Sequence, residues 1–138
     1  MSTPPDARAM PVVTLRGSAI DGIAGFHAEI NRAFMAGEDW QLGDSLDALD
    51  DMLYGGYGAL AGHSHPRVVW QDIAHSRRAL GREATRHWLQ AKLARPDTFN
   101  VALITGQLEA LEAGHGPTYF EIVMEIFAAH PRITLIPA

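Results

Sequence analysis

Four aspartates lie within eight residues of the segment LGDSLDALDDML, residues 42–53, and no basic residue accompanies them there. Carboxylates gathered on one surface can hold a metal ion or bind the basic surface of another protein. A helix over 44–53, at about 100° per residue, would place its leucines together on a core face. Those leucines are Leu46, Leu49 and Leu53. The opposite face would carry Asp44, Asp47 and Asp51, with Asp50 on the flank.

Two of these aspartates have a structural explanation. We expect Asp44 to cap the helix and Asp47 to lie in the first turn, where the helix dipole favours an anion. Asp51 lies beyond that turn, four residues after Asp47, and such a like-charge pair costs about 0.2–0.5 kcal/mol. Asp50 and Asp51 are therefore either a solvated surface or part of a binding site.

The acidic charge of the chain is concentrated in one segment. The chain has 11 basic and 16 acidic residues and a net charge of −5, yet no Lys or Arg lies between Arg32 and Arg67. That interval contains Glu38, Asp39, Asp44, Asp47, Asp50 and Asp51. A nucleic-acid-binding protein needs a basic patch, so this distribution argues against that class and favours a cationic partner or a metal.

Length and composition indicate a small globular protein. The 138 residues suit a flexible tail over 1–10 and one domain over 11–138. The chain has no cysteine, which excludes disulfides and thiolate metal sites and agrees with a reducing compartment. No apolar run approaches the roughly 20 residues of a membrane span.

The remaining pattern predicts an α/β fold. Short apolar runs predict strands at 11–17, 66–71 and 132–137, and unbroken apolar strands are typical of a parallel sheet covered by helices. Helices are expected from Asp21 to Gly37, from Asp72 to about 80, over 82–96, over 97–114, and behind a Thr118–Glu121 capping box to about 130. The glycine-rich stretch 55–66 is predicted to be a mobile loop.

The acidic segment resembles the second helix of the barstar family, intracellular inhibitors of the secreted ribonuclease barnase. The resemblance rests on LGDSLDALDDMLYG, with Gly43, Leu46-Asp47-Ala48-Leu49, Asp51 and Gly55 at matching positions. The flanks agree: VVTLRG matches the first strand, RVVWQDIAHS the second strand and its helix, and FEIVMEIFAAHPRITLIPA the closing helix and strand. It covers residues 11–81 and 118–138, and leaves 82–116 as an extra helical insertion without a counterpart. We expect this insertion to be a scaffold extension that covers one face of the sheet.

The resemblance implies a three-stranded parallel sheet packed with helices, no enzymatic activity and no cofactor. It also implies a cytotoxic ribonuclease as partner and a location in the cytoplasm of the producing cell. Family members plug the basic cleft of the ribonuclease with the second helix and the loop before it. Barnase and barstar are a reference case of charge complementarity between two proteins. The complementarity expected here therefore follows from the resemblance and does not support it separately. The implied partner-binding residues are Trp40, Gln41, Gly43, Asp44, Ser45, Leu46, Asp47, Asp50, Asp51, Gly55 and Glu125.

Several positions depart from the family pattern. The aromatic residue before the loop glycine is replaced by Gln41 and Leu42, with Trp40 as a neighbouring substitute. Asp50 stands where the family has a tryptophan, and Ser45 where it has an asparagine. Aromatic residues often dominate interface energies, so we expect a cognate ribonuclease other than barnase itself.

Two other functions fit parts of the sequence. His63 and His65, together with Asp47 or Asp51, could bind zinc, although they lack a diagnostic ligand spacing. The acidic helix could also belong to a general interaction module for another basic protein. A hydrolase that uses paired aspartates is disfavoured, because the chain has no nucleophile elbow, phosphate loop or metalloprotease motif.

Overall fold

A computed structural model describes residues 12–138, and the predicted tail over 1–10 and the start of the first strand lie outside that range. Three parallel strands form one sheet in the order β1-β2-β3. They are β1 (Val12–Arg16), β2 (Arg67–Gln71) and β3 (Thr134–Pro137). Leu15 pairs with Trp70, and both are fully buried. The predicted parallel sheet is therefore confirmed.

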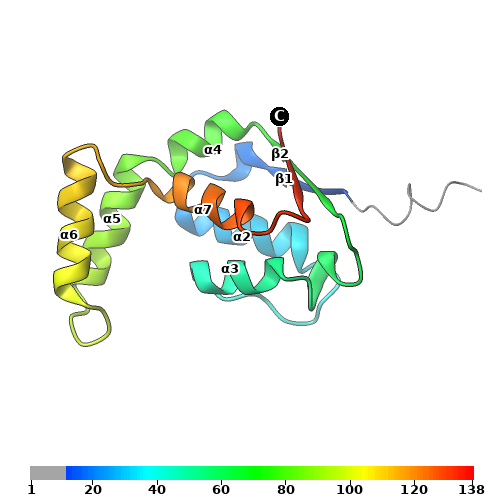
Figure 1. Ribbon diagram of the computed structural model, residues 1–138, viewed down its shortest axis with the longest axis horizontal. Helices are drawn as coiled ribbons and strands as arrows, with labels where there is room; N and C mark the ends of the chain where they lie inside the picture. Colours follow the sequence, from blue (N-terminus) through cyan, green and yellow to red (C-terminus); the bar gives the residue numbers. More distant parts are fainter. Residues whose placement is uncertain (1–11) are drawn as a thin grey trace, which may run out of the picture.

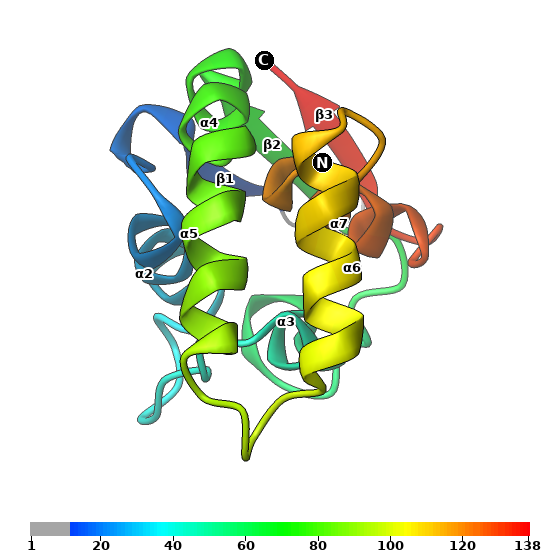
Figure 2. The ribbon, with the colours of Figure 1, turned by 90° about the vertical axis from the view of Figure 1, so that its left-hand side faces the viewer.

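Within residues 12–138, six α-helices accompany the sheet. They are α2 (Ile23–Phe34), α3 (Leu46–Leu53), α4 (Ile73–Ala79), α5 (Arg82–Leu93), α6 (Val101–Glu112) and α7 (Tyr119–Ala128). Single 3₁₀ turns occur at η1 (Gly17–Ala19) and η2 (Gly58–Leu60). Helices α2, α3 and α7 lie beside the sheet, whereas α5 and α6 form a hairpin at the end of the molecule away from it (Figures 1 and 2).

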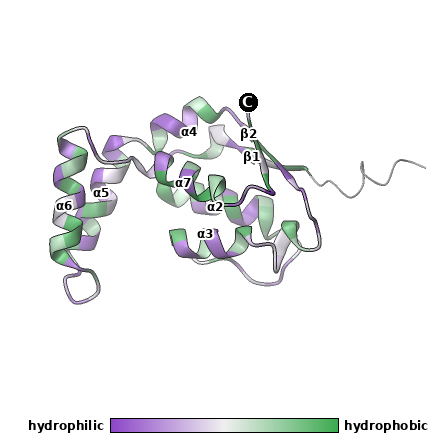
Figure 3. Ribbon diagram, in the orientation of Figure 1, coloured by the Kyte–Doolittle hydropathy of each residue, from purple (hydrophilic) through white to green (hydrophobic). Residues whose placement is uncertain are grey.

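The apolar residues form two clusters. The main core joins the sheet to α2, α3 and α7, with Trp70, Phe26 and Phe120 at its centre. A second, smaller cluster lies inside the α5–α6 hairpin around Leu89 and Ile104. Hydrophobic and hydrophilic residues alternate along the helices (Figure 3), as expected for elements that bury one side each.

The ends of several elements differ from the sequence-based expectation. The N-cap of α2 is Gly22, because Asp21 turns outward to His75, with 2.9 Å between Oδ1 and Nε2. Helix α2 ends at Phe34, three residues before Gly37. The stretch 55–66 is not wholly a mobile loop, because η2 inserts Leu60 fully into the main core.

A buried carboxylate ties α2 to β1. Glu29 is 3% exposed and accepts hydrogen bonds from the Arg16 backbone N–H (2.6 Å) and from Arg32 Nη2 (2.6 Å). Burial raises the pKa of Glu29, but these hydrogen bonds outweigh it and lower the pKa to about 2. Arg32 also donates to the Thr14 carbonyl at 2.8 Å, so one ion pair links helix and strand.

Candidate functional site: the acidic face of helix α3

Helix α3 begins at a serine cap. Ser45 has extended backbone angles, and its hydroxyl accepts a hydrogen bond from the Ala48 N–H at 3.0 Å. The expectation that Asp44 caps the helix is therefore wrong, because the helix starts one residue later than the aspartate would require. Asp44 is exposed, and Asp47 takes the expected place in the first turn.

The two faces of α3 are separated as the sequence predicted. Leu49 and Leu53 are buried at 1% and 0% exposure, and Met52 joins them in the core, which the leucine pattern had not included. Leu46 is half-buried at the edge of this cluster. With one side of the helix locked in the core, the carboxylates of the opposite side have fixed positions on the surface.

Asp51 lies beside an aromatic pair. The Tyr57 hydroxyl donates to Asp51 Oδ2 at 2.8 Å, and the rings of Tyr57 and Trp40 are 4.8 Å apart. Burial, and then the Asp51 carboxylate, raise the pKa of Tyr57 to about 12. Asp51 therefore has a hydrogen-bond partner within the chain, and that partner is a neutral hydroxyl that adds no opposite charge.

Asp50 is turned toward α7 instead. Its Oδ1 lies 2.7 Å from Nε2 of His130, a residue only 5% exposed, and Tyr54 packs edge-on against the same imidazole. Asp50 thus joins α3 to the end of α7, in the position where the family has a tryptophan. Sequence reasoning did not identify His130, because 80 residues separate it from Asp50.

The loop before α3 is held by an asparagine. Asn31 on α2 accepts from the Leu42 N–H at 2.7 Å and donates to the Leu42 carbonyl at 3.3 Å. Leu42 itself is buried in the main core, so this position serves packing here and cannot present an aromatic ring to a partner. Its neighbours Gln41 and Gly43 are exposed.

Arg132 contacts the C-terminal end of α3. Gly55 has a φ of +85°, and a Cβ at this residue would clash with the Arg132 guanidinium. Arg132 donates to the carbonyls of Leu53 (3.0 Å) and His63 (2.8 Å), so its charge complements the C-terminal end of the helix. Gly55 has a structural reason of its own, since it permits this close approach.

The N-terminal end of α3 faces the α5–α6 hairpin. A cavity of about 410 Å³ is lined there by Asp44 and Asp47 on one side and by Trp88, Lys92 and Phe99 on the other. Burial lowers the pKa of Lys92, and the charge of Asp47 opposes that effect. The predicted insertion therefore borders the acidic face.

Glu125 is exposed on α7, as expected. Helix α7 contacts α3, but the described contacts connect Glu125 to none of the α3 aspartates.

The described residues give no support to the metal alternative. Within 12–138, no three His, Asp or Glu side chains are grouped closely enough to hold a metal ion. In the same range, no helix is both long enough and apolar enough to cross a membrane.

Comparison with protein families shows a match over much of the chain. The family model described as Barstar (barnase inhibitor) matches residues 10–95. The match ends just after α5, so it includes the first part of the segment that we expected to have no counterpart, and it stops before α6, α7 and β3. No curated protein matches the chain. Because the model spans more than half of the sequence, and the fold has the parallel sheet and helices expected from it, the chain belongs to the barstar family.

Proposed function

We propose that this protein inhibits a barnase-type ribonuclease by placing the acidic face of α3 in the basic active-site cleft of the enzyme. The observation that carries the proposal is the position of Asp47 and Asp51. Both are exposed on a helix whose other face is buried in the core, in a chain of the barstar family. The protein would have no catalytic activity of its own and would act in the cytoplasm of the cell that makes the ribonuclease.

The physical basis is substitution of carboxylates for phosphates. A ribonuclease cleft gathers Arg, Lys and His side chains to bind RNA phosphates, and carboxylates form similar charge-assisted hydrogen bonds with such groups. Because α3 is fixed before binding, little conformational entropy is lost when its carboxylates are bound. The acidic surface would also accelerate encounter with a basic enzyme.

The neighbouring residues have supporting roles in this proposal. Trp40, 44% exposed, and Tyr57 form an aromatic surface next to Asp51, and aromatic residues often anchor interfaces. This pair would replace the aromatic contacts that the family pattern places at other positions. Glu125 would add a carboxylate from α7.

The proposal is tested by a binding experiment with two kinds of basic protein. The purified chain is mixed with a panel of barnase-type ribonucleases and, separately, with a basic protein of similar charge that has no RNA-binding cleft. We expect a 1:1 complex with a ribonuclease, and we expect a non-cleavable oligonucleotide analogue to compete with it. Equal binding to the cleft-free protein, or a complex that the analogue does not disturb, would favour the general interaction module instead.

A further inference from the structure

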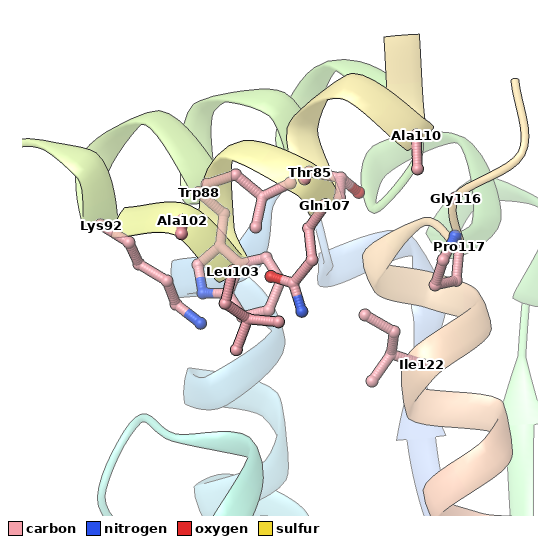
Figure 4. Close-up of a pocket in the computed structure, with 12 residues that line it drawn as sticks. Thr85, Trp88, Lys92, Ala102, Leu103, Gln107, Ala110, Gly116, Pro117 and Ile122 are labelled. Carbon is pink, nitrogen blue, oxygen red and sulfur yellow. The ribbon is translucent and has the colours of Figure 1, made fainter. Parts of the chain in front are cut away.

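The α5–α6 hairpin encloses an apolar groove on its inner side. A cavity of about 420 Å³ lies between α5, α6 and the start of α7. Figure 4 shows Leu103 and Gln107 of α6 and Trp88 of α5 on one side of this space, with Ile122 of α7 on the other. The small residues Ala102, Gly106 and Ala110 complete the α6 wall.

This groove is continuous with the acidic face of α3. Trp88 and Lys92 line both the groove and the cavity that contains Asp44 and Asp47. The Lys92 ammonium lies 3.8 Å from the centre of the Trp88 ring, and its charge interacts with Asp47. A protein bound against the N-terminal end of α3 would therefore also reach the mouth of the groove.

The groove wall carries apolar surface that the chain leaves uncovered. Leu103, in the first turn of α6, is 57% exposed. Exposure of a leucine side chain to water is energetically unfavourable. A Cβ at Gly106 would meet nothing within 4 Å, so the space in front of α6 is open. The hairpin has its own small core around Leu89 and Ile104, so Leu103 is not needed to hold α5 and α6 together.

We propose that this groove is a second docking surface for the same ribonuclease, and that it receives an apolar side chain from the enzyme surface beside the active-site cleft. This inference rests on the proposed function. Two observations select this occupant over others. The groove shares Trp88 and Lys92 with the cavity beside the start of α3, and the carboxylates of Asp44 and Asp47 that line that cavity complement a basic protein. The hairpin would thus enlarge the interface and help to select the cognate enzyme by shape.

The sharpest test fills the groove from a single position. Gly106→Trp places a large side chain in the open space, and Gly106→Ala is the matched control that keeps the helix and leaves the groove empty. We expect Gly106→Trp to weaken binding to the ribonuclease at least tenfold and Gly106→Ala to bind like the wild type. Circular dichroism and thermal unfolding of both variants check that the hairpin still folds.

A second pair of variants tests the apolar contact without steric blockage. Leu103→Gln and Val101→Gln both exchange an exposed apolar residue in the first turn of α6, but among the two only Leu103 lines the groove. We expect a severalfold loss of affinity for Leu103→Gln and no change for Val101→Gln.

The possible outcomes separate the two proposals. If Asp51→Ala weakens binding but Gly106→Trp and Leu103→Gln do not, the groove proposal is overturned and the proposed function stands. If the wild type binds no ribonuclease of the panel, the proposed function fails and the groove proposal fails with it. If light scattering shows that the free chain dimerises and Gly106→Trp abolishes the dimer, a second copy is the occupant, which also overturns the groove proposal.

Discussion

Asp51, the proposed main contact with the ribonuclease, is held in place by neighbouring side chains. Its carboxylate accepts a hydrogen bond from Tyr57, and Tyr57 in turn packs against Trp40, so two residues from the loops around α3 set its orientation. The Tyr57 hydroxyl is uncharged, so its contact with Asp51 is not an ion pair. Asp50, by contrast, faces His130 and is partly engaged within the chain. We therefore expect Asp51 to contribute more to binding than its neighbour does.

Alanine substitution of the proposed contact residues should give a defined order of effects. We expect Asp51→Ala to weaken ribonuclease binding by about 2 kcal/mol or more, the range of an interface hot spot, and Asp47→Ala and Glu125→Ala by about 1 kcal/mol each. Dissociation constants from titration calorimetry would establish the order. Asp21→Ala removes an exposed carboxylate at the start of α2 and is the control. Wild-type affinity in all three variants would refute the assignment of the interface.

The hydroxyl of Tyr57 should matter through Asp51. Tyr57→Phe keeps the ring that packs on Trp40 but removes the hydrogen bond, so we expect a loss of about 0.5–1.5 kcal/mol in binding with unchanged thermal stability. Tyr54 is an exposed tyrosine just after α3 whose ring packs on His130. The substitution Tyr54→Phe is the comparison. Equal effects of the two substitutions would mean that Tyr57 does not orient Asp51.

Some of these residues could be predicted from the sequence and others could not. The outward positions of Asp47 and Asp51 follow from helical periodicity, because the leucines fix which side of α3 is buried. The contacts of His130 with Asp50 and of Arg132 with the end of α3 depend on tertiary folding across about 80 residues. No local pattern carries that information.

At the scale of an element, the start of α3 provides a direct comparison between two candidate caps. Ser45→Ala should lower the free energy of unfolding by about 1 kcal/mol, because the Ala48 N–H loses its acceptor. Asp44→Ala should change stability by no more than a few tenths of a kcal/mol, since Asp44 is exposed and lies outside the helix. Urea unfolding of both variants measures this difference, and the reverse order would identify Asp44 as the cap.

The link between α2 and β1 should make the protein sensitive to acid. The pKa of Glu29 falls to about 2 in the folded state, below its ordinary value of 4.5, so the folded protein favours the ionised form. This contributes roughly 3 kcal/mol of stability above pH 4.5, which is lost progressively as the pH falls toward 2. Glu29→Gln should destabilise the protein at pH 7 but much less at pH 2.5. Parallel loss of stability in wild type and variant across this range would contradict the role of Glu29.

The number and type of the elements were largely predictable, whereas their ends were not. Three apolar runs gave the strands, and the Thr118–Glu121 capping box marked the start of α7, where both of its hydrogen bonds are present. Aspartate is a frequent N-cap, which makes Asp21 and Asp44 candidate caps in the sequence. In the structure the N-cap is the next residue in each case. The burial of Leu60 was hidden by the glycines around it.

For the whole molecule, the arrangement of charge matters more than its total. The net charge of −5 is small, but six carboxylates are concentrated in the interval without Lys or Arg, and four of them lie in or next to α3. Such a surface attracts a basic protein over distances of about one Debye length, roughly 10 Å at 0.1 M salt. The proposed mechanism therefore requires association to slow as salt is added.

The position of the hairpin is a property of the whole molecule that the sequence did not reveal. The helical spacing in 82–114 indicated two helices, and both are present as α5 and α6. These two helices border the acidic face, and Lys92 lies close to Asp47. This placement depends on how α5 continues from α4 and how the chain returns to α7. The prediction that this segment is a scaffold extension over one face of the sheet is wrong, because α5 and α6 lie away from the sheet (Figure 1).

Inhibition of a panel of barnase-type ribonucleases by the purified chain, at low and at high salt, tests the central claim most directly. The account predicts stoichiometric inhibition of at least one enzyme, with an association rate that falls steeply as salt rises, and clearly weaker inhibition by Asp51→Ala. Full activity of every enzyme at an excess of the chain would contradict it.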